Sequence, residues 1–198
     1  MKTIQYFFFV VLGCVLMAAD CSNKDSEFYN DIYVTIPELV TIETQNSYAV
    51  NDVLWLNSDN FSRYLTEPNQ TTQLDVLKTT NAQSFSFTYL LEKKVGTDTW
   101  ELVLPGNALI TQRGSAVETD LFIAAACVYN AGSEEYEFRS GIRLTQPGEY
   151  RLSFGYNSVS TTAVELRSDS FNNNLFLNIN SPNTELDGSG NYNFTVSE

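Results

Sequence analysis

Apolar and polar positions alternate along most of the chain beyond residue 32, and this period of two predicts β-strands with one buried face. The alternating segments are 32–36, 40–43, 53–56, 85–92, 99–104, 121–129, 136–144, 163–166, 174–179 and 192–196. Residues 96–98 and 130–133 contain turn-forming residues, so each predicts a hairpin between the two segments that flank it. Residues 61–80 are less regular, and their short apolar groups fit either a helix or an edge strand.

The number and spacing of these segments predict an all-β fold. Eight to ten short strands follow one another without a long amphipathic helix between them. A parallel α/β sheet would need such helices as crossovers, so the pattern favours a two-layered β-sandwich. No internal repeat or linker divides residues 32–198, and we therefore expect this region to form a single domain.

The first twenty residues have the layout of a secretory signal. Met1 and Lys2 precede residues 4–19, in which Gln5 is the only strongly polar side chain. This arrangement is typical of a signal peptide, and the apolar run is shorter than the roughly 20 residues that a membrane-spanning helix needs.

The end of this leader resembles the lipobox of bacterial lipoproteins, in which a cysteine is acylated and becomes the new N-terminus. Ala18 and Ala19 match the positions before the cysteine, Cys21 matches the cysteine itself, and Asp20 departs from the small residue that the family has there. The resemblance implies that residues 1–20 are a lipoprotein signal peptide and that Cys21 carries the lipid. Cys14 has a similar context, but cleavage there would leave a very short apolar core. A plain cleaved signal peptide is the alternative.

Residues 21–31 are polar and acidic, which predicts a tether between lipid and domain. Their Lys24 with neighbouring acidic residues resembles the surface-export tract of Bacteroidetes lipoproteins. That resemblance implies an outer-membrane lipoprotein, anchored through its N-terminal lipid in the cell envelope and exposed at the cell surface.

Residues 144–154 contain a second resemblance. Leu144, Pro147-Gly148 and Tyr150 precede an alternating run, as in the tyrosine corner of immunoglobulin-like sandwiches. In that motif the tyrosine hydroxyl binds a backbone group a few residues upstream. The resemblance implies an immunoglobulin-like antiparallel β-sandwich, while an ordinary turn before a strand explains the same residues.

Charge and composition exclude several functions. Eleven Lys and Arg against 24 Asp and Glu leave a net charge of −13, which disfavours nucleic acid as a partner. The absence of His excludes histidine-based triads and thermolysin-type zinc sites. Of the three cysteines, Cys14 leaves with the leader and Cys21 is acylated, so Cys127 remains alone in an apolar segment. We expect it to pack in the core.

Carboxylates offer the remaining route to catalysis. Glu134, Glu135 and Glu137 form the densest group, but they lie at the end of a predicted hairpin, where solvated charge is expected. Neither a nucleophile elbow nor a phosphate-binding glycine loop is present. No catalytic residue is therefore predicted.

Aromatic and amide side chains are the candidates for binding, because flat rings stack on ligands and amides supply directed hydrogen bonds. Trp100, Tyr129 and Tyr136 are the candidate ligand-binding residues, whereas we expect Trp55 to lie in the core. Asp187, Ser189 and Asn191 alternate oxygen-bearing side chains in a glycine-rich stretch, a spacing that can hold Ca²⁺. A polar loop without a metal is the alternative, and no other cofactor is expected.

These observations favour a non-enzymatic, membrane-anchored surface lipoprotein that acts as a recognition or assembly module with a protein partner. An accessory glycan-binding lipoprotein of an outer-membrane nutrient-uptake system is the alternative. A carboxylate-based glycoside hydrolase is a second alternative from a different class.

Overall fold

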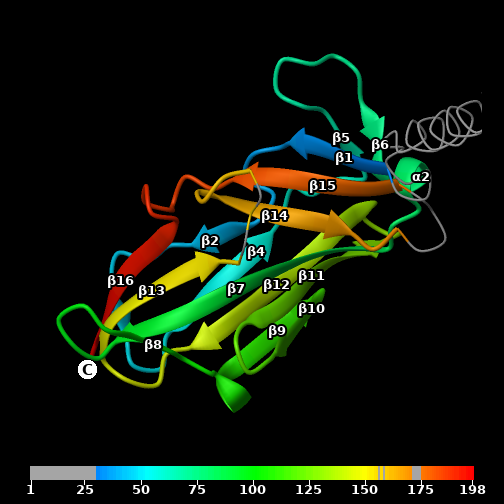
Figure 1. The fold of residues 1–198 in the computed structure, drawn as a ribbon. Coiled ribbons are helices and arrows are strands. Elements are labelled where there is room, and N and C mark those ends of the chain that lie inside the picture. Colours follow the sequence, from blue (N-terminus) through cyan, green and yellow to red (C-terminus); the bar gives the residue numbers. More distant parts are fainter. Residues whose placement is uncertain (1–29, 156, 158, 171–174) are drawn as a thin grey trace, which may run out of the picture.

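The structure is a computed structural model that describes residues 30–155, 157, 159–170 and 175–198. The prediction of an all-β fold is confirmed (Figure 1). The leader, Cys21 and nearly all of the predicted tether lie outside the described residues. Helix in the described part is confined to α2 (Val76–Thr80) and a 3-10 turn, η1 (Gly106–Ala108), and no helix there is long and apolar enough to cross a membrane.

The strands follow the chain in this order: β1 (Asn30–Thr35), β2 (Thr41–Glu43), β3 (Tyr48–Ala49), β4 (Val53–Ser58), β5 (Tyr64–Leu65), β6 (Leu74–Asp75), β7 (Ser84–Lys94), β8 (Trp100–Leu102), β9 (Leu109–Arg113), β10 (Ser115–Glu118), β11 (Ile123–Asn130), β12 (Glu135–Arg143), β13 (Gly148–Phe154), β14 (Ala163–Ser168), β15 (Leu175–Pro182) and β16 (Asn191–Ser197). Both predicted hairpins are present, β7 with β8 and β11 with β12. Strands β9 and β10 were not among the predicted segments, and β5 and β6 lie within residues 61–80, which fitted either a helix or an edge strand.

Strand β7 is the centre of the sheet. One of its edges pairs first with β14 and then with β13, while the other edge pairs with β11 and then with β8. The inner face of β7 is apolar and buried at Phe85, Phe87, Tyr89 and Leu91, and its outer face carries Ser86 and Thr88. This alternation is the period-two pattern of the sequence.

The sheet curls because β11 and β12 diverge after their hairpin. Strand β12 pairs with β4, and the bent pair β9 and β10 fills the space between the diverging strands. The bend falls at Gly114, where φ is 69° and a Cβ would lie 2.5 Å from the carbonyl oxygen of Ala126. The curled sheet encloses one core, in which the rings of Phe87 on β7 and Phe138 on β12 are 5.0 Å apart.

The prediction of a purely antiparallel fold is wrong. Strand β1 pairs in parallel with β15, and β3 pairs in parallel with β16, so the sheet is mixed. Alternation along a strand marks its buried face but not the direction of its neighbour, and these partners are far apart in sequence. Strand β1 also begins at Asn30 rather than at the predicted residue 32.

The hydrogen bond of a tyrosine corner is present at the start of β13. Tyr150 is buried, and its Oη donates to the backbone oxygen of Gln146 at 2.9 Å. Gly148 has φ of 143°, as this tight approach to the strand requires.

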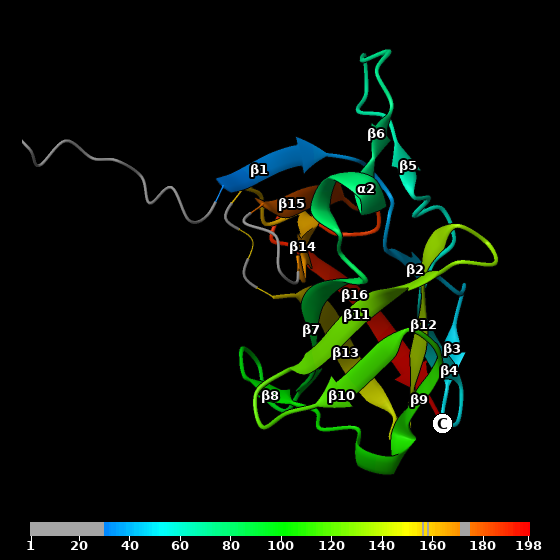
Figure 2. The same cartoon turned by 90° about the vertical axis from the view of Figure 1, so that its right-hand side faces the viewer.

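The two ends of the molecule differ in the elements that they carry. Helix α2 and the hairpin of β5 and β6 lie at one end, and β8 with the C-terminus lies at the other (Figures 1 and 2). Strand β1, with which the described chain begins, starts on the side of α2 in Figure 1.

Candidate functional site

The candidate ligand-binding residues do not form one site. Tyr136 lies in the core, with no exposed surface, and its Oη donates to the backbone oxygen of Ala82 at 3.0 Å. Its ring packs against Phe61 and Phe85, so the structure places Tyr136 among the core residues rather than on a binding surface. The half-buried ring of Tyr129 packs beside it at 5.2 Å. Alternation marked Tyr136 as a strand residue but did not reveal what covers its ring.

The two tryptophans lie on the outer face of the sheet, each against an arginine. The guanidinium of Arg151 is 4.5 Å from the ring centre of half-buried Trp100. Trp55 lies on this outer face rather than in the predicted core. It is half-buried because Arg139 covers it at 4.6 Å on one side. A Cβ at Gly141 would lie 2.6 Å from the Trp55 ring, so the ring packs closely on that glycine.

The predicted calcium residues form a compact turn. Oδ1 of Asp187 accepts from the backbone N–H groups of Ser189 and Asn191, at 2.8 and 3.0 Å, and Oδ2 accepts from Nδ2 of Asn193 at 2.7 Å. These hydrogen bonds lower the pKa of Asp187 below its ordinary value. Both carboxylate oxygens therefore already have N–H donors. Across the described ranges, no group of three or more Cys, Asp or Glu side chains is placed to hold a metal ion.

The dense acidic group at the hairpin of β11 and β12 has structural partners. Glu134 forms an ion pair with Arg63 at 3.2 Å. Oε1 of Glu137 accepts from Asn130 and Ser133, at 2.9 and 2.8 Å, and so holds the turn. Cys127 is fully buried, and burial raises the pKa of its thiol to about 12. The thiol is thus protonated near neutral pH and has the core position that the sequence predicted.

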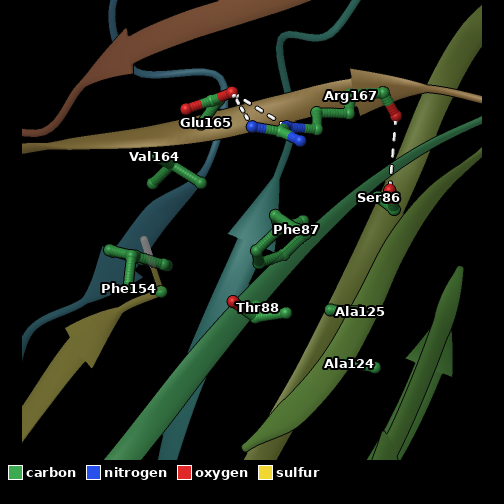
Figure 3. A pocket seen from close by; sticks show the side chains of 10 residues that line it. Ser86, Phe87, Thr88, Ala124, Ala125, Phe154, Val164, Glu165 and Arg167 are labelled. Atoms are coloured by element: carbon green, nitrogen blue, oxygen red, sulfur yellow. Dashed lines mark hydrogen bonds and ion pairs between the residues drawn. The ribbon is translucent and has the colours of Figure 1, made fainter. Parts of the chain in front are cut away.

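Two adjoining clefts hollow the outer face of the sheet, and we call them together the outer groove. The first, of about 420 Å³, is lined by residues of β7, β11, β13 and β14 (Figure 3). The second, of about 510 Å³, continues from it past Arg151 to the turn at Ser189. Phe154 and Gly155 line both clefts, so the two clefts meet at these residues.

The groove exists because β13 and β14 separate along the same edge of β7. Strand β14 pairs with β7 at Phe85 and Ser86, and β13 pairs from Tyr89 onward. At the gap between them, the N–H of Gly155 donates to the carbonyl oxygen of Thr88 at 2.8 Å. A Cβ on Gly155 would lie 1.8 Å from Oγ1 of Thr88, so the approach requires glycine.

The charged side chains of the groove are internally paired. Glu165, whose side chain is 3% exposed, forms an ion pair with Arg167 at 2.7 Å, and Figure 3 shows both on β14 above Ser86. In the second cleft, Arg151 pairs with Glu92 at 2.7 Å while stacking on Trp100. The remaining polar lining consists of hydroxyl and amide groups, as in Ser153, Asn157 and Asn191. The groove thus offers neutral hydrogen-bonding groups beside apolar surface.

Sequence reasoning identified Ser189 and Asn191 but missed the groove that they line. Trp100 does not line the groove and lies behind Arg151, which does. Arg151 and Glu92 are 59 residues apart, and their pairing depends on the register of β7 and β13. The available signal was Gly155, a glycine that ends an alternating run and so indicates close backbone approach.

No protein-family model, curated protein or solved structure matches the chain.

Proposed function

We propose that the chain is a non-enzymatic recognition module that a lipid on Cys21 holds at the bacterial outer membrane, with its domain exposed at the cell surface. The leader and its lipobox resemblance support the anchor. In this proposal the outer groove binds an extended segment of a protein partner, and the module works in surface assembly.

The outer groove, with its two adjoining clefts, is the observation that carries this proposal. Its two clefts together cross several strands, which suits an extended chain better than a compact small molecule. Glu165 and Glu92 are each paired with an arginine. The groove is therefore less acidic than the average surface of a chain with a net charge of −13. A partner therefore meets little electrostatic repulsion there.

We also propose that the curled sheet is an immunoglobulin-like sandwich in which edge strands have joined in parallel. The tyrosine corner at Tyr150 and the packing of β7 against β12 support this assignment. The parallel partners β1 and β3 are the departure from the usual pattern.

Blocking the groove tests the proposed function. In the full-length protein, Ser86→Trp places a large ring in the first cleft, and Ser115→Trp on β10 is the matched control outside the groove. Crosslinking in intact producing cells, followed by mass spectrometry, should recover one defined protein with the wild type and with Ser115→Trp. Loss of that protein with Ser86→Trp alone is expected, and equal recovery with all three proteins would contradict the assignment.

Glycan capture in the same groove is the second candidate, because hydroxyl and amide groups dominate its polar lining. A glycan array probed with the full-length protein tests this candidate. Sugar binding that Ser86→Trp abolishes and Ser115→Trp leaves unchanged supports glycan capture in the groove. Steady release of sugar from such glycans would instead support the carboxylate-based hydrolase.

A further inference from the structure

A separate pocket lies at the end of the molecule that carries the C-terminus. It has a volume of about 440 Å³, and we call it the end pocket. Its lining comes from the segment before and within β3 and from β16, as follows: Gln45, Asn46, Ser47, Tyr48, Tyr192, Asn193, Phe194, Thr195 and Ser197. None of these lining residues carries a charge, although the chain has a net charge of −13. The outer groove shares none of them.

Aromatic rings form one wall of the end pocket. Phe194 lies between Tyr192 and Tyr150, at centroid distances of 5.5 and 5.6 Å, with interplanar angles of 23° and 15°. Tyr192 and Phe194 are only half-buried, although they point to the same side of β16 as buried Val196. The short strand β3 pairs with Val196 and Ser197 but not with the earlier part of β16, which leaves these two rings partly open.

The hydroxyl groups of Tyr48 and Tyr192 lie within hydrogen-bonding distance of each other. Tyr48 Oη donates to the backbone oxygen of Glu43 at 3.3 Å, which uses its only proton. Tyr192 Oη lies 3.3 Å from Tyr48 Oη, and it is the donor between them when Tyr48 donates to Glu43. Burial raises the pKa of Tyr48 well above its ordinary range, so its hydroxyl stays protonated near neutral pH. Tyr192 Oη therefore keeps its lone pairs as acceptors for another hydroxyl.

Amide and hydroxyl groups border the rings. The side chains of Asn46 and Ser47 are exposed and form no hydrogen bond within the part of the chain that the structure describes. Nε2 of Gln45 donates to the carbonyl oxygen of Val53 at 3.5 Å, and its Oε1 has no donor among the described residues. Donors and acceptors are thus available beside an apolar ring surface without any charged group.

We propose that the end pocket binds a neutral sugar ring. The apolar C–H face of a pyranose would stack on the ring of Tyr192 beside Phe194, and its hydroxyls would bond to Tyr192 Oη, Asn46 and Gln45. An anionic sugar would find no cation among the lining residues, and an apolar ligand would leave the amides unused. This site goes beyond the proposed protein-binding groove and stands on different residues.

Isothermal titration of the full-length protein with maltohexaose, cellohexaose, mannohexaose and an oligogalacturonate of the same length tests the proposal. At least one of the three neutral hexasaccharides should bind, and the anionic one should bind at least tenfold more weakly. Tyr192→Ala should weaken binding about tenfold or more, and Tyr192→Phe, which keeps the ring but not the acceptor, by a few-fold. Asn46→Ala should also weaken it by a few-fold.

Tyr33→Ala is the matched control, because Tyr33 is an exposed tyrosine on β1, away from the pocket. It should leave the affinity unchanged, and denaturant unfolding of each variant verifies that the fold is retained. Three results would overturn the proposal: no binding of any neutral hexasaccharide, preference for the oligogalacturonate, or binding that Tyr192→Ala does not weaken. None of them depends on the groove variant Ser86→Trp, so the two proposals fail independently.

Discussion

Two aromatic clusters occupy opposite ends of the molecule and differ in what covers them. Near α2, the rings of Phe61, Phe85 and Tyr136 pack at 4.8 to 5.0 Å, and all three are fully buried. At the other end, Tyr192 and Phe194 stack at 5.5 Å and remain half-buried. Ring clustering is therefore common to both regions, and coverage by a neighbouring segment separates a core cluster from one that can meet a ligand.

The largest effect is expected from Phe85→Ala in the covered cluster. Removing a fully buried ring that contacts both Phe61 and Tyr136 should lower the free energy of unfolding by about 3 to 5 kcal/mol. Urea unfolding followed by tryptophan fluorescence measures this change. The same measurement on Tyr192→Ala, in the open cluster, provides the comparison. An equal loss of unfolding free energy in that variant would show that both clusters contribute equally to stability.

Gly155→Ala should have the next largest effect, because the new Cβ would lie 1.8 Å from Oγ1 of Thr88. We expect a loss of about 1 to 3 kcal/mol in unfolding free energy, as for other overpacked sites. Urea unfolding of Gly155→Ala, Thr88→Ala and the double variant measures it. The double variant should recover part of the loss, and strict additivity would contradict the assigned contact.

Replacing single hydroxyls compares the two clusters more finely. Tyr136→Phe leaves the buried carbonyl of Ala82 without this donor and should cost about 1 kcal/mol. Tyr192→Phe removes a hydroxyl at an open pocket and should change stability much less. Thermal unfolding of both variants tests this order, and a larger loss for Tyr192→Phe would reverse it.

The smallest effect is expected at the ion pair beside the covered cluster. Two hydrogen bonds from Arg63 to Asp75, at 2.9 and 2.7 Å, join the chain before β5 to the N-cap of α2 and lower the pKa of Asp75 from 3.8 to about 2. A carboxylate with a lowered folded-state pKa stabilises the fold above its unfolded pKa and loses that contribution as the pH falls toward the folded value.

Unfolding measured between pH 6 and pH 2 tests this linkage. The wild type should be slightly more stable than Asp75→Asn at about pH 6, and the difference should shrink as the pH falls through about 4 toward 2. A difference that stays constant over this range would show that Asp75 acts through the hydrogen bond to Lys78 N–H rather than through its charge.

Local patterns in the sequence were sufficient for the hairpins and for the tyrosine corner. Alternation ending in turn residues predicted β7 with β8 and β11 with β12, and Pro147-Gly148 before Tyr150 predicted the hydrogen bond to Gln146. Each of these features depends on residues close together in the chain.

Features that join distant segments could not be predicted in this way. The parallel pairing of β1 with β15 depends on tertiary packing, and Tyr48 lies 144 residues from Tyr192 in the end pocket. Strands β9 and β10 were missed because they are short and the bend at Gly114 interrupts their alternation. Tyr136 and Tyr192 each lie in an alternating run, so the pattern alone gives no reason to assign one to the core and the other to a pocket.

The most direct test of the comparison is NMR of full-length protein with ¹³C-labelled tyrosine rings, titrated with the neutral hexasaccharides and assigned with Tyr→Phe variants. We predict that the ring signals of Tyr192 and Tyr48 shift progressively with added sugar, while those of Tyr136 and Tyr89 stay in place. Unchanged Tyr192 signals at saturating sugar, or equal shifts in the buried rings, would contradict the account.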